Sequence, residues 1–300
     1  MIRVAPGTVD PSNMPRRGSD GLFLLALSII GGLYVLLIVG MLAADIAFLR
    51  PSPSTGHALN AGQALAAMAG KAVAPLRRPE IRFALRLSLL SCSITAILSV
   101  FFAVPLGYIL SRFRFPLRGL LDAVLDIPIV LPPLVIGLSL LILLQTPPGR
   151  FIERHITITY AAPAVILAQF TVACAFAVRT MRATFDQQNP RTEQVAMTLG
   201  CSRFQAFWLV TLPEASRGML TAGTLAWARA LGEFGPILVF AGTTRFRTEV
   251  LPTSIFLEFS VGNLDAAVAI SMLMVAAAVG VLIVIRFVGG QGLAAGAVRR

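Results

Sequence analysis

Hydropathy divides the chain into six long, mainly apolar runs, separated by shorter polar segments that carry most of the prolines and arginines. Each run has 24 residues or more, whereas an α-helix needs about 20 to cross a hydrocarbon core about 30 Å thick. The runs cover residues 22–49, 83–110, 120–145, 160–184, 219–242 and 264–287. The pattern therefore predicts six transmembrane helices.

Composition narrows the fold class to a membrane protein. Hydrophobic residues make up 56% of the 300 residues and charged residues 13%, about half the charged share of a typical soluble domain. So few charged residues cannot cover a soluble globule, and the chain is too apolar to be disordered. The strands of a membrane barrel alternate apolar and polar residues, which these runs do not. We expect an all-α, polytopic membrane helix bundle.

The formal net charge of +11 is informative about the orientation of the chain in the membrane and does not indicate a nucleic-acid ligand. The basic residues form short clusters between the apolar runs, without the interleaved aromatics of a nucleic-acid surface, so no nucleic-acid partner is expected. With the N-terminus inside, the cytoplasmic segments hold 14 basic residues and the outer segments 8. We therefore expect a multi-pass protein of the cell inner membrane. By the positive-inside rule, both of its termini are predicted to lie in the cytoplasm.

The remaining segments carry little chemistry. Residues 1–20 are predicted to be a disordered cytoplasmic tail and residues 288–300 a second cytoplasmic tail, while the loop 50–80 is expected outside. The run 22–49 exceeds the roughly 7–15 apolar residues of a signal peptide, so it is predicted to remain as the first membrane helix. The three cysteines and two histidines form no ligand pattern, so neither a metal nor a cofactor is expected.

The long segment between the fourth and fifth runs has clear helix signals. Asn189 can cap a helix that begins at Pro190, and Gly200 can end that helix in a left-handed conformation. Ser202 and Gln205 have the spacing of a capping box that starts a second helix. The segment is therefore predicted to form two short helices joined by a glycine elbow.

The second helix is expected to end at Leu212-Pro213. Apolar side chains give the pair of helices an amphipathic character; they are Val195, Leu199, Phe204, Phe207 and Trp208. Taken alone, this pattern leaves two interpretations open. The pair could lie in the membrane interface and cap the bundle, or it could contact a partner protein.

The same segment resembles the cytoplasmic signature loop of type I ATP-binding-cassette (ABC) importer permeases. That signature reads Glu-Ala-Ala, three residues, Gly, nine residues, Ile, any residue and Leu-Pro. Here Gln194 takes the place of the signature Glu, and an acidic residue precedes it. The residues that carry the resemblance are Glu193, Gln194, Val195, Ala196, Gly200, Val210, Leu212 and Pro213. The resemblance implies that residues 83–287 form a type I ABC transmembrane domain whose coupling loop, 186–216, sits in a cleft of a partner ATPase.

Two further stretches, 126–138 and 227–242, resemble segments of molybdate and sulfate permeases. The second contains the Arg-Ala-x-Gly-Glu-Phe-Gly pattern of those permeases. The resemblance implies import of a tetrahedral oxyanion such as molybdate, tungstate or sulfate. It also implies a homodimer that works with two ABC ATPase subunits and an extracytoplasmic solute-binding protein.

Two ionisable residues in the fifth run are candidates for the translocation path. Arg229 and Glu233 are four residues apart and therefore share a helix face, and charges within a membrane usually face the bundle interior or a water-filled path. They could line a path or gate, or could form a pair that only fixes packing. Gly232, Gly235 and Pro236 weaken the helix there. The candidate path residues are Arg229, Gly232, Glu233, Phe234 and Gly235.

Prolines also interrupt the third run. Pro128, Pro132 and Pro133 each remove a backbone donor and are predicted to kink or break it. Asp122 and Asp126 precede them on one helix face, and we interpret them as part of a helix entry near the inner interface.

The chain lacks the phosphate-binding signature of an ATPase, because its only lysine lies in no G-x-x-x-x-G-K-[ST] motif. It is therefore expected to be a transport subunit and not an enzyme. The alternatives are a six-span secondary transporter or channel, and an ABC permease for another class of solute. A membrane-embedded enzyme is less favoured, because no catalytic cluster of ionisable residues stands out.

Overall fold

The computed structural model describes residues 20–48, 70 and 74–297. The predicted tail 1–20 (apart from its last residue), most of the loop 50–80 and the last three residues lie outside the described residues. Helices make up all of the regular secondary structure that is described.

The N-terminal helix α1 (Asp20–Phe48) belongs to a compact unit of its own, separate from the unit formed by residues 59–300. Nearly all of its described side chains are exposed, and they are apolar on every side. A helix that is apolar all round must be buried in a larger core or in a membrane. This helix matches the first predicted span.

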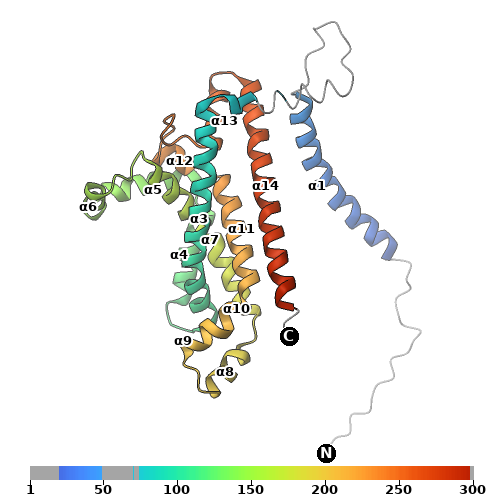
Figure 1. The fold of residues 1–300 in the computed structure, drawn as a ribbon, viewed down its shortest axis with the longest axis vertical. Coiled ribbons are helices and arrows are strands. Elements are labelled where there is room, and N and C mark those ends of the chain that lie inside the picture. The colour runs from blue at the N-terminus through green and yellow to red at the C-terminus, as the bar shows by residue number, and fades with distance from the viewer. Residues whose placement is uncertain (1–19, 49–69, 71–73, 298–300) are drawn as a thin grey trace, which may run out of the picture. The chain divides into compact units, whose positions relative to one another are not determined.

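Four long helices run side by side in the second unit (Figure 1). They are α3 (Pro79–Arg112), α7 (Ala162–Gln187), α11 (Ser216–Leu231) and α14 (Leu264–Ala297). Where α3, α7 and α11 meet, the buried residues are largely alanines, including Ala96, Ala173, Ala177, Ala222 and Ala226. Small side chains let membrane helices approach closely and pack through their backbones. The helix α14 extends ten residues beyond the predicted end of the sixth run.

Shorter helices complete the bundle. They are η2 (Ala74–Arg77), α4 (Arg118–Val130), α5 (Pro133–Gln145), α6 (Pro147–His155), α8 (Pro190–Thr198), α9 (Arg203–Ala206), η3 (Phe207–Thr211), α10 (Leu212–Glu214), α12 (Gly235–Phe240) and α13 (Leu251–Ser260). Helix α13 lies at one end of the bundle, and the helices of the predicted coupling loop lie at the other (Figure 1).

Four described helices are long and apolar enough to cross a membrane: α1, α3, α7 and α14. A fifth crossing is obtained if α4 and α5, which meet at a bend of 113°, count as one span. The break falls at Leu131 and Pro132, as the prolines of the third run predicted, whereas Pro128 lies inside α4 without ending it. The predicted span 219–242 is divided between α11 and α12, so the count of six stays a prediction.

The two divided spans pack against each other through a pair of glycines. A Cβ added at Gly137 in α5 would lie 2.8 Å from the Cα of Pro236 in α12. A Cβ added at Gly235 would lie 2.8 Å from the Cβ of Pro133. Both positions therefore require glycine for α5 and α12 to approach this closely.

Candidate functional site

The predicted elbow is present, with the predicted caps. The side chain of Asn189 accepts a hydrogen bond from the backbone N–H of Arg191 at 3.0 Å and caps α8. Gly200 has φ of +96°, in the left-handed region that favours glycine. Both bonds of the capping box between Ser202 and Gln205 are formed, at 2.8 and 3.2 Å. Local signals thus determined the path of the chain from α8 to α9.

The prediction that Leu212-Pro213 ends the second helix is wrong. After α9 the chain forms a π-helical turn, η3, in which the N–H of Leu212 bonds the carbonyl of Phe207, five residues back. It then continues through α10 and the single turn residue Ala215 into α11. Proline has no N–H and its ring clashes with the carbonyl four residues back. The wider turn relieves that clash, so the chain accommodates Pro213 without stopping.

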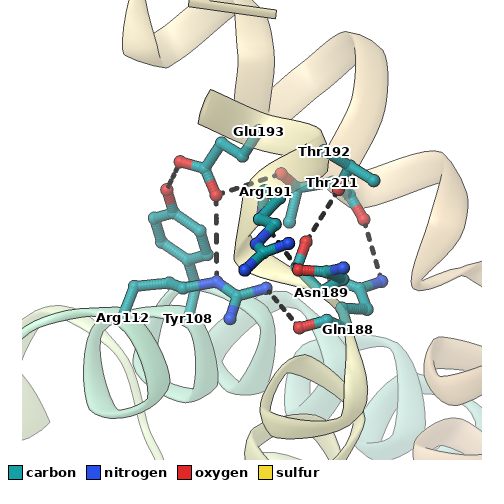
Figure 2. Close-up of polar contacts among 8 residues, drawn as sticks. All are labelled: Tyr108, Arg112, Gln188, Asn189, Arg191, Thr192, Glu193 and Thr211. Atoms are coloured by element: carbon teal, nitrogen blue, oxygen red, sulfur yellow. Dashed lines mark hydrogen bonds and ion pairs between the residues drawn. The ribbon is translucent and has the colours of Figure 1, made fainter. Parts of the chain in front are cut away.

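Glu193 fixes the base of the loop to the end of α3 (Figure 2). Its Oε1 accepts a hydrogen bond from the hydroxyl of Tyr108 at 2.5 Å, and its Oε2 accepts one from Thr211 at 3.4 Å. The Nε of Arg112 lies 3.8 Å from the same Oε2. Only 7% of Glu193 is exposed. A buried carboxylate is tolerated only when it is paired and hydrogen-bonded in this way.

Two more contacts tie the same region together. The guanidinium of Arg112 donates to the backbone carbonyl of Gln188 at 3.3 Å, and the Gln188 side chain donates to the carbonyl of Thr211 at 3.2 Å. The ring of Tyr108 packs edge-on against Phe207 in η3, with 4.7 Å between centroids. The end of α3, the end of α7 and the start of α8 are therefore joined to the π-helical turn.

The tip of the loop is exposed, in contrast to its base. Val195 is 56% exposed and Leu199 82%, and Gln194 and Gly200 are also exposed. Of the other predicted loop residues, Ala196 is buried, Val210 and Leu212 are half-buried, and Pro213 is exposed. The loop thus has exposed apolar side chains at its tip and buried polar contacts that anchor its base.

The predicted path residues gather at the break between α11 and α12. The Arg229 guanidinium lies 2.6 Å from the carboxylate of Glu233, which is 1% exposed. Helix α11 ends at Leu231, Gly232 is exposed, and Gly235 begins α12. The half-buried ring of Phe234 contacts Phe256, with 5.1 Å between centroids. This group lies in the bundle away from α8 (Figure 1), so the structure does not bring the two predicted groups together.

A buried amide that the sequence reading missed lies beside this break. Gln169 in α7 is 2% exposed; its Nε2 donates to the carbonyl of Ala230 at 3.2 Å, and its Oε1 accepts from Thr95 in α3 at 3.3 Å. Helix α11 ends here, and the Ala230 carbonyl accepts from the backbone N–H of Glu233 at 3.1 Å in a tightened last turn. Gln169 adds a second donor to the same carbonyl and connects α3, α7 and α11.

The aspartates of α4 also have partners on α7. Asp126 accepts from Arg179, with 2.6 Å between Oδ1 and Nε, and Asp122 pairs with Arg182. The sequence placed the two aspartates on one face, but it gave no sign of the arginines more than fifty residues away. Between α7 and α11 lies a hollow of about 710 Å³, and Arg179, Arg217 and Glu214 are among the residues that line it.

The fold has solved counterparts. A bacterial ABC transporter involved in the import of the acidic polysaccharide alginate superposes with a TM-score of 0.69 over 91% of this chain and 96% of that one, at 15% sequence identity. A second structure of a bacterial alginate ABC transporter, in complex with an alginate-bound periplasmic protein, also gives 0.69, over 90% and 94%. The bundle therefore defines a polytopic membrane protein with the transmembrane fold of an ABC importer.

The chain belongs to the binding-protein-dependent transport system inner membrane component family, whose model matches residues 103–293. It is 35% identical over 202 residues to the sulfate transport system permease protein CysT of Salmonella typhimurium (66% of this chain, 73% of the relative). It is 37% identical over 203 residues to the molybdenum transport system permease protein ModB of Mycobacterium bovis (67% and 76%). The molybdate/tungstate permease WtpB of Thermococcus kodakarensis is 31% identical over 219 residues (73% and 83%). The predicted resemblance is confirmed.

Proposed function

We propose that this chain is the permease subunit of an ABC importer for a tetrahedral oxyanion of the sulfate, molybdate and tungstate class. It works as a homodimer with two ATPase subunits and receives the anion from an extracytoplasmic solute-binding protein. The names of the relatives CysT, ModB and WtpB support the cargo class. The family description supports the binding protein.

The observation that carries the coupling role is the contrast between the buried base of the loop and its exposed tip. Exposed apolar side chains such as Leu199 favour contact with another protein. Glu193 holds the base of the loop against the end of α3, so a force on the tip is passed through the base to the membrane helices. The tip residues 194–200 then occupy a cleft of the ATPase.

We further propose six crossings with both termini in the cytoplasm. In this arrangement α4 with α5, and α11 with α12, each form one broken crossing. The excess of basic residues on the loop side supports this orientation. A check uses Cys201 beside the elbow, which is half-buried. A membrane-impermeant maleimide should label it in inverted vesicles and not in intact cells, and labelling in intact cells would reverse the orientation.

Arg229, Gly232, Glu233, Phe234 and Gly235 are proposed as the gate of the anion path. A carboxylate repels an oxyanion, so Glu233 acts as the partner of Arg229 and not as a ligand. The chain carries no ATP-binding loop of its own, so ATP hydrolysis belongs to the partner subunits.

The coupling proposal is tested by two substitutions at one position. Gly200→Val places a β-branched residue in a left-handed conformation, whereas Gly200→Asn places one that tolerates it. The space beside Gly200 is open, so neither side chain clashes. In proteoliposomes with the ATPase and binding protein, the Val variant should hydrolyse ATP with little uptake, and the Asn variant should stay close to wild type. Equal coupling in both variants would contradict the elbow model.

The cargo is tested by uptake of labelled molybdate and sulfate in cells, each competed with the other anion and with tungstate. We expect uptake that depends on the ATPase and persists when the ion gradient is dissipated. Uptake that survives loss of the ATPase would favour a secondary transporter. ATPase-dependent complexes that import none of these anions would favour a permease for another solute.

A further inference from the structure

A groove with apolar walls lies between α3 and the π-helical turn η3, close to the coupling loop. It has two lobes of about 360 and 320 Å³. Pro105, Phe207 and Trp208 line both lobes, so the two lobes are adjacent. Among the described residues that line it, Arg203 is the one charged side chain.

The floor of the groove continues the exposed apolar side of α3. Ile97, Phe101, Pro105 and Ile109 follow one another at intervals of four, so they form a single stripe along the helix. All four are exposed in the isolated chain, Ile97 and Phe101 by about 70%. Because α3 is long and apolar enough to span a membrane, this stripe faces either lipid or another membrane helix. Phe101, Pro105 and Ile109, toward the C-terminal end of the stripe, also line the groove.

The other side of the groove has the features of a membrane interface. The guanidinium of Arg203 lies 5.3 Å from the centroid of the Phe113 ring and forms no ion pair with a described residue. Trp208 is 52% exposed, and tryptophan is enriched where a membrane meets water. Arg203 thus lines an apolar groove that continues the exposed apolar stripe of α3, and no acidic partner for it lies among the described residues.

We propose that this groove binds an anionic phospholipid from the leaflet on the loop side, with an acyl chain along the α3 stripe and the phosphate beside Arg203. The combination of one unpaired cation with apolar walls complements an anionic amphiphile. Val195 and Leu199, at the exposed tip, are not among the groove residues. Lipid binding and the proposed ATPase contact therefore use different parts of the loop.

A lipid in this groove would affect the coupling between the loop and the membrane helices, because it packs against the turn that anchors the loop. The lipid contacts η3 at Phe207 and Trp208, and Thr211 in the same turn bonds both Glu193 and Gln188. A molecule that packs on η3 therefore supports the turn that anchors the loop. The inference goes beyond the proposed function and does not depend on the cargo.

The test uses the chain's own fluorescence. Trp208 and Trp227 are its two tryptophans, and Trp227 is only 3% exposed. The variant Trp227→Phe is reconstituted as the full chain without the ATPase. Trp208 is then its remaining tryptophan, so the fluorescence emission reports on the groove. Vesicles are titrated with phosphatidylglycerol or phosphatidylcholine brominated on the acyl chain. We expect half-maximal quenching at about a fivefold lower fraction of the anionic lipid, the factor that one basic residue contributes at an anionic surface.

Arg203→Gln should abolish that preference, whereas Arg114→Gln, a nearby exposed arginine outside the groove, should leave it intact. Equal quenching by the two lipids, or a preference that survives Arg203→Gln, would overturn the proposal. Absence of quenching by either lipid would also overturn it and would indicate that a second copy of the chain covers the groove. Because no ATPase is present, none of these outcomes depends on the importer assignment.

Discussion

The carboxylate of Glu193 in α8 lies 2.5 Å from the hydroxyl of Tyr108 in α3, although 85 positions separate them in the chain. The family signature places its acidic residue at Gln194, which is exposed here. The buried acidic contact of this loop is therefore made one position earlier than the signature indicates. This register determines which substitutions should affect coupling.

Glu193→Ala should loosen the loop. It leaves the buried Tyr108 hydroxyl without its acceptor, which costs roughly 1–3 kcal/mol, and it removes the ion-pair partner of Arg112. We expect a lower melting temperature in detergent and less uptake per ATP hydrolysed. Gln194→Ala, at an exposed neighbouring position, is the matched control for stability and should keep the wild-type melting temperature. Wild-type coupling in Glu193→Ala, or a fall in melting temperature confined to Gln194→Ala, would contradict the assigned register.

Glu233→Gln should impair uptake while the protein still reaches the membrane. The substitution removes the negative charge 2.6 Å from Arg229 and leaves an uncompensated cation in the bundle, an arrangement that membrane interiors disfavour. Uptake and surface abundance are measured together. Asp265→Asn, an exposed charge change in α14, serves as the control. Unchanged uptake in Glu233→Gln would show that the pair only fixes packing.

Gly137→Ala and Gly235→Ala should each destabilise the contact between α5 and α12. The added methyl group would lie 2.8 Å from a proline carbon of the facing helix, and overpacking of this kind costs typically 1–3 kcal/mol. Thermal unfolding in detergent measures the loss. At Gly232 the nearest atom to an added Cβ is 3.9 Å away, so Gly232→Ala should melt near the wild-type temperature. Equal losses at all three positions would point to backbone flexibility as the cause.

Glu249, in the segment between α12 and α13, should make stability depend on pH. Burial raises the pKa of its carboxyl group, and the charges of Glu80 and Glu258 add to the rise, while the Ser254 hydrogen bond and Arg245 oppose it. The stabilising contribution of the protonated form is complete below the unfolded pKa of about 4.3. It is lost as the pH rises through the higher folded pKa.

Lowering the pH toward the unfolded pKa of about 4.3 should therefore raise the melting temperature of the wild type relative to that of Glu249→Gln. The variant should also be at least as stable as the wild type at neutral pH, because it removes a buried charge. Glu214→Gln, an exposed glutamate, should retain the wild-type pH profile. A Glu249→Gln profile parallel to that of the wild type would exclude this carboxyl group as the source.

Features that depend on neighbouring residues were predictable from the sequence. The caps at Asn189 and Ser202, the left-handed Gly200 and the break at Pro132 each follow from interactions within a few positions. Long-range partners were not predictable. Tyr108 and Arg112 lie at the end of an apolar run where polar side chains are ordinary, and nothing in their local pattern identifies Glu193.

One local signal gave the wrong result for a physical reason. Leu212-Pro213 indicates a helix end, because proline usually cannot continue a helix. The π-helical turn before it supplies an extra residue per turn, and that turn is held by contacts of Thr211 with distant parts of the chain. A pattern limited to the neighbouring residues does not contain that support.

Helix α3 is held at both ends in the same manner. Arg78, just before its first residue, donates to Glu258 of α13 at 3.1 Å, and Arg112, its last residue, pairs with Glu193 of α8. Each glutamate is more than nine-tenths buried. At 1.5 Å per residue, the 34 residues of α3 form a helix about 50 Å long. A shift of α3 along its axis displaces both arginines together. While both ion pairs are formed, α13 at one end of the bundle and α8 at the other therefore cannot move independently of each other.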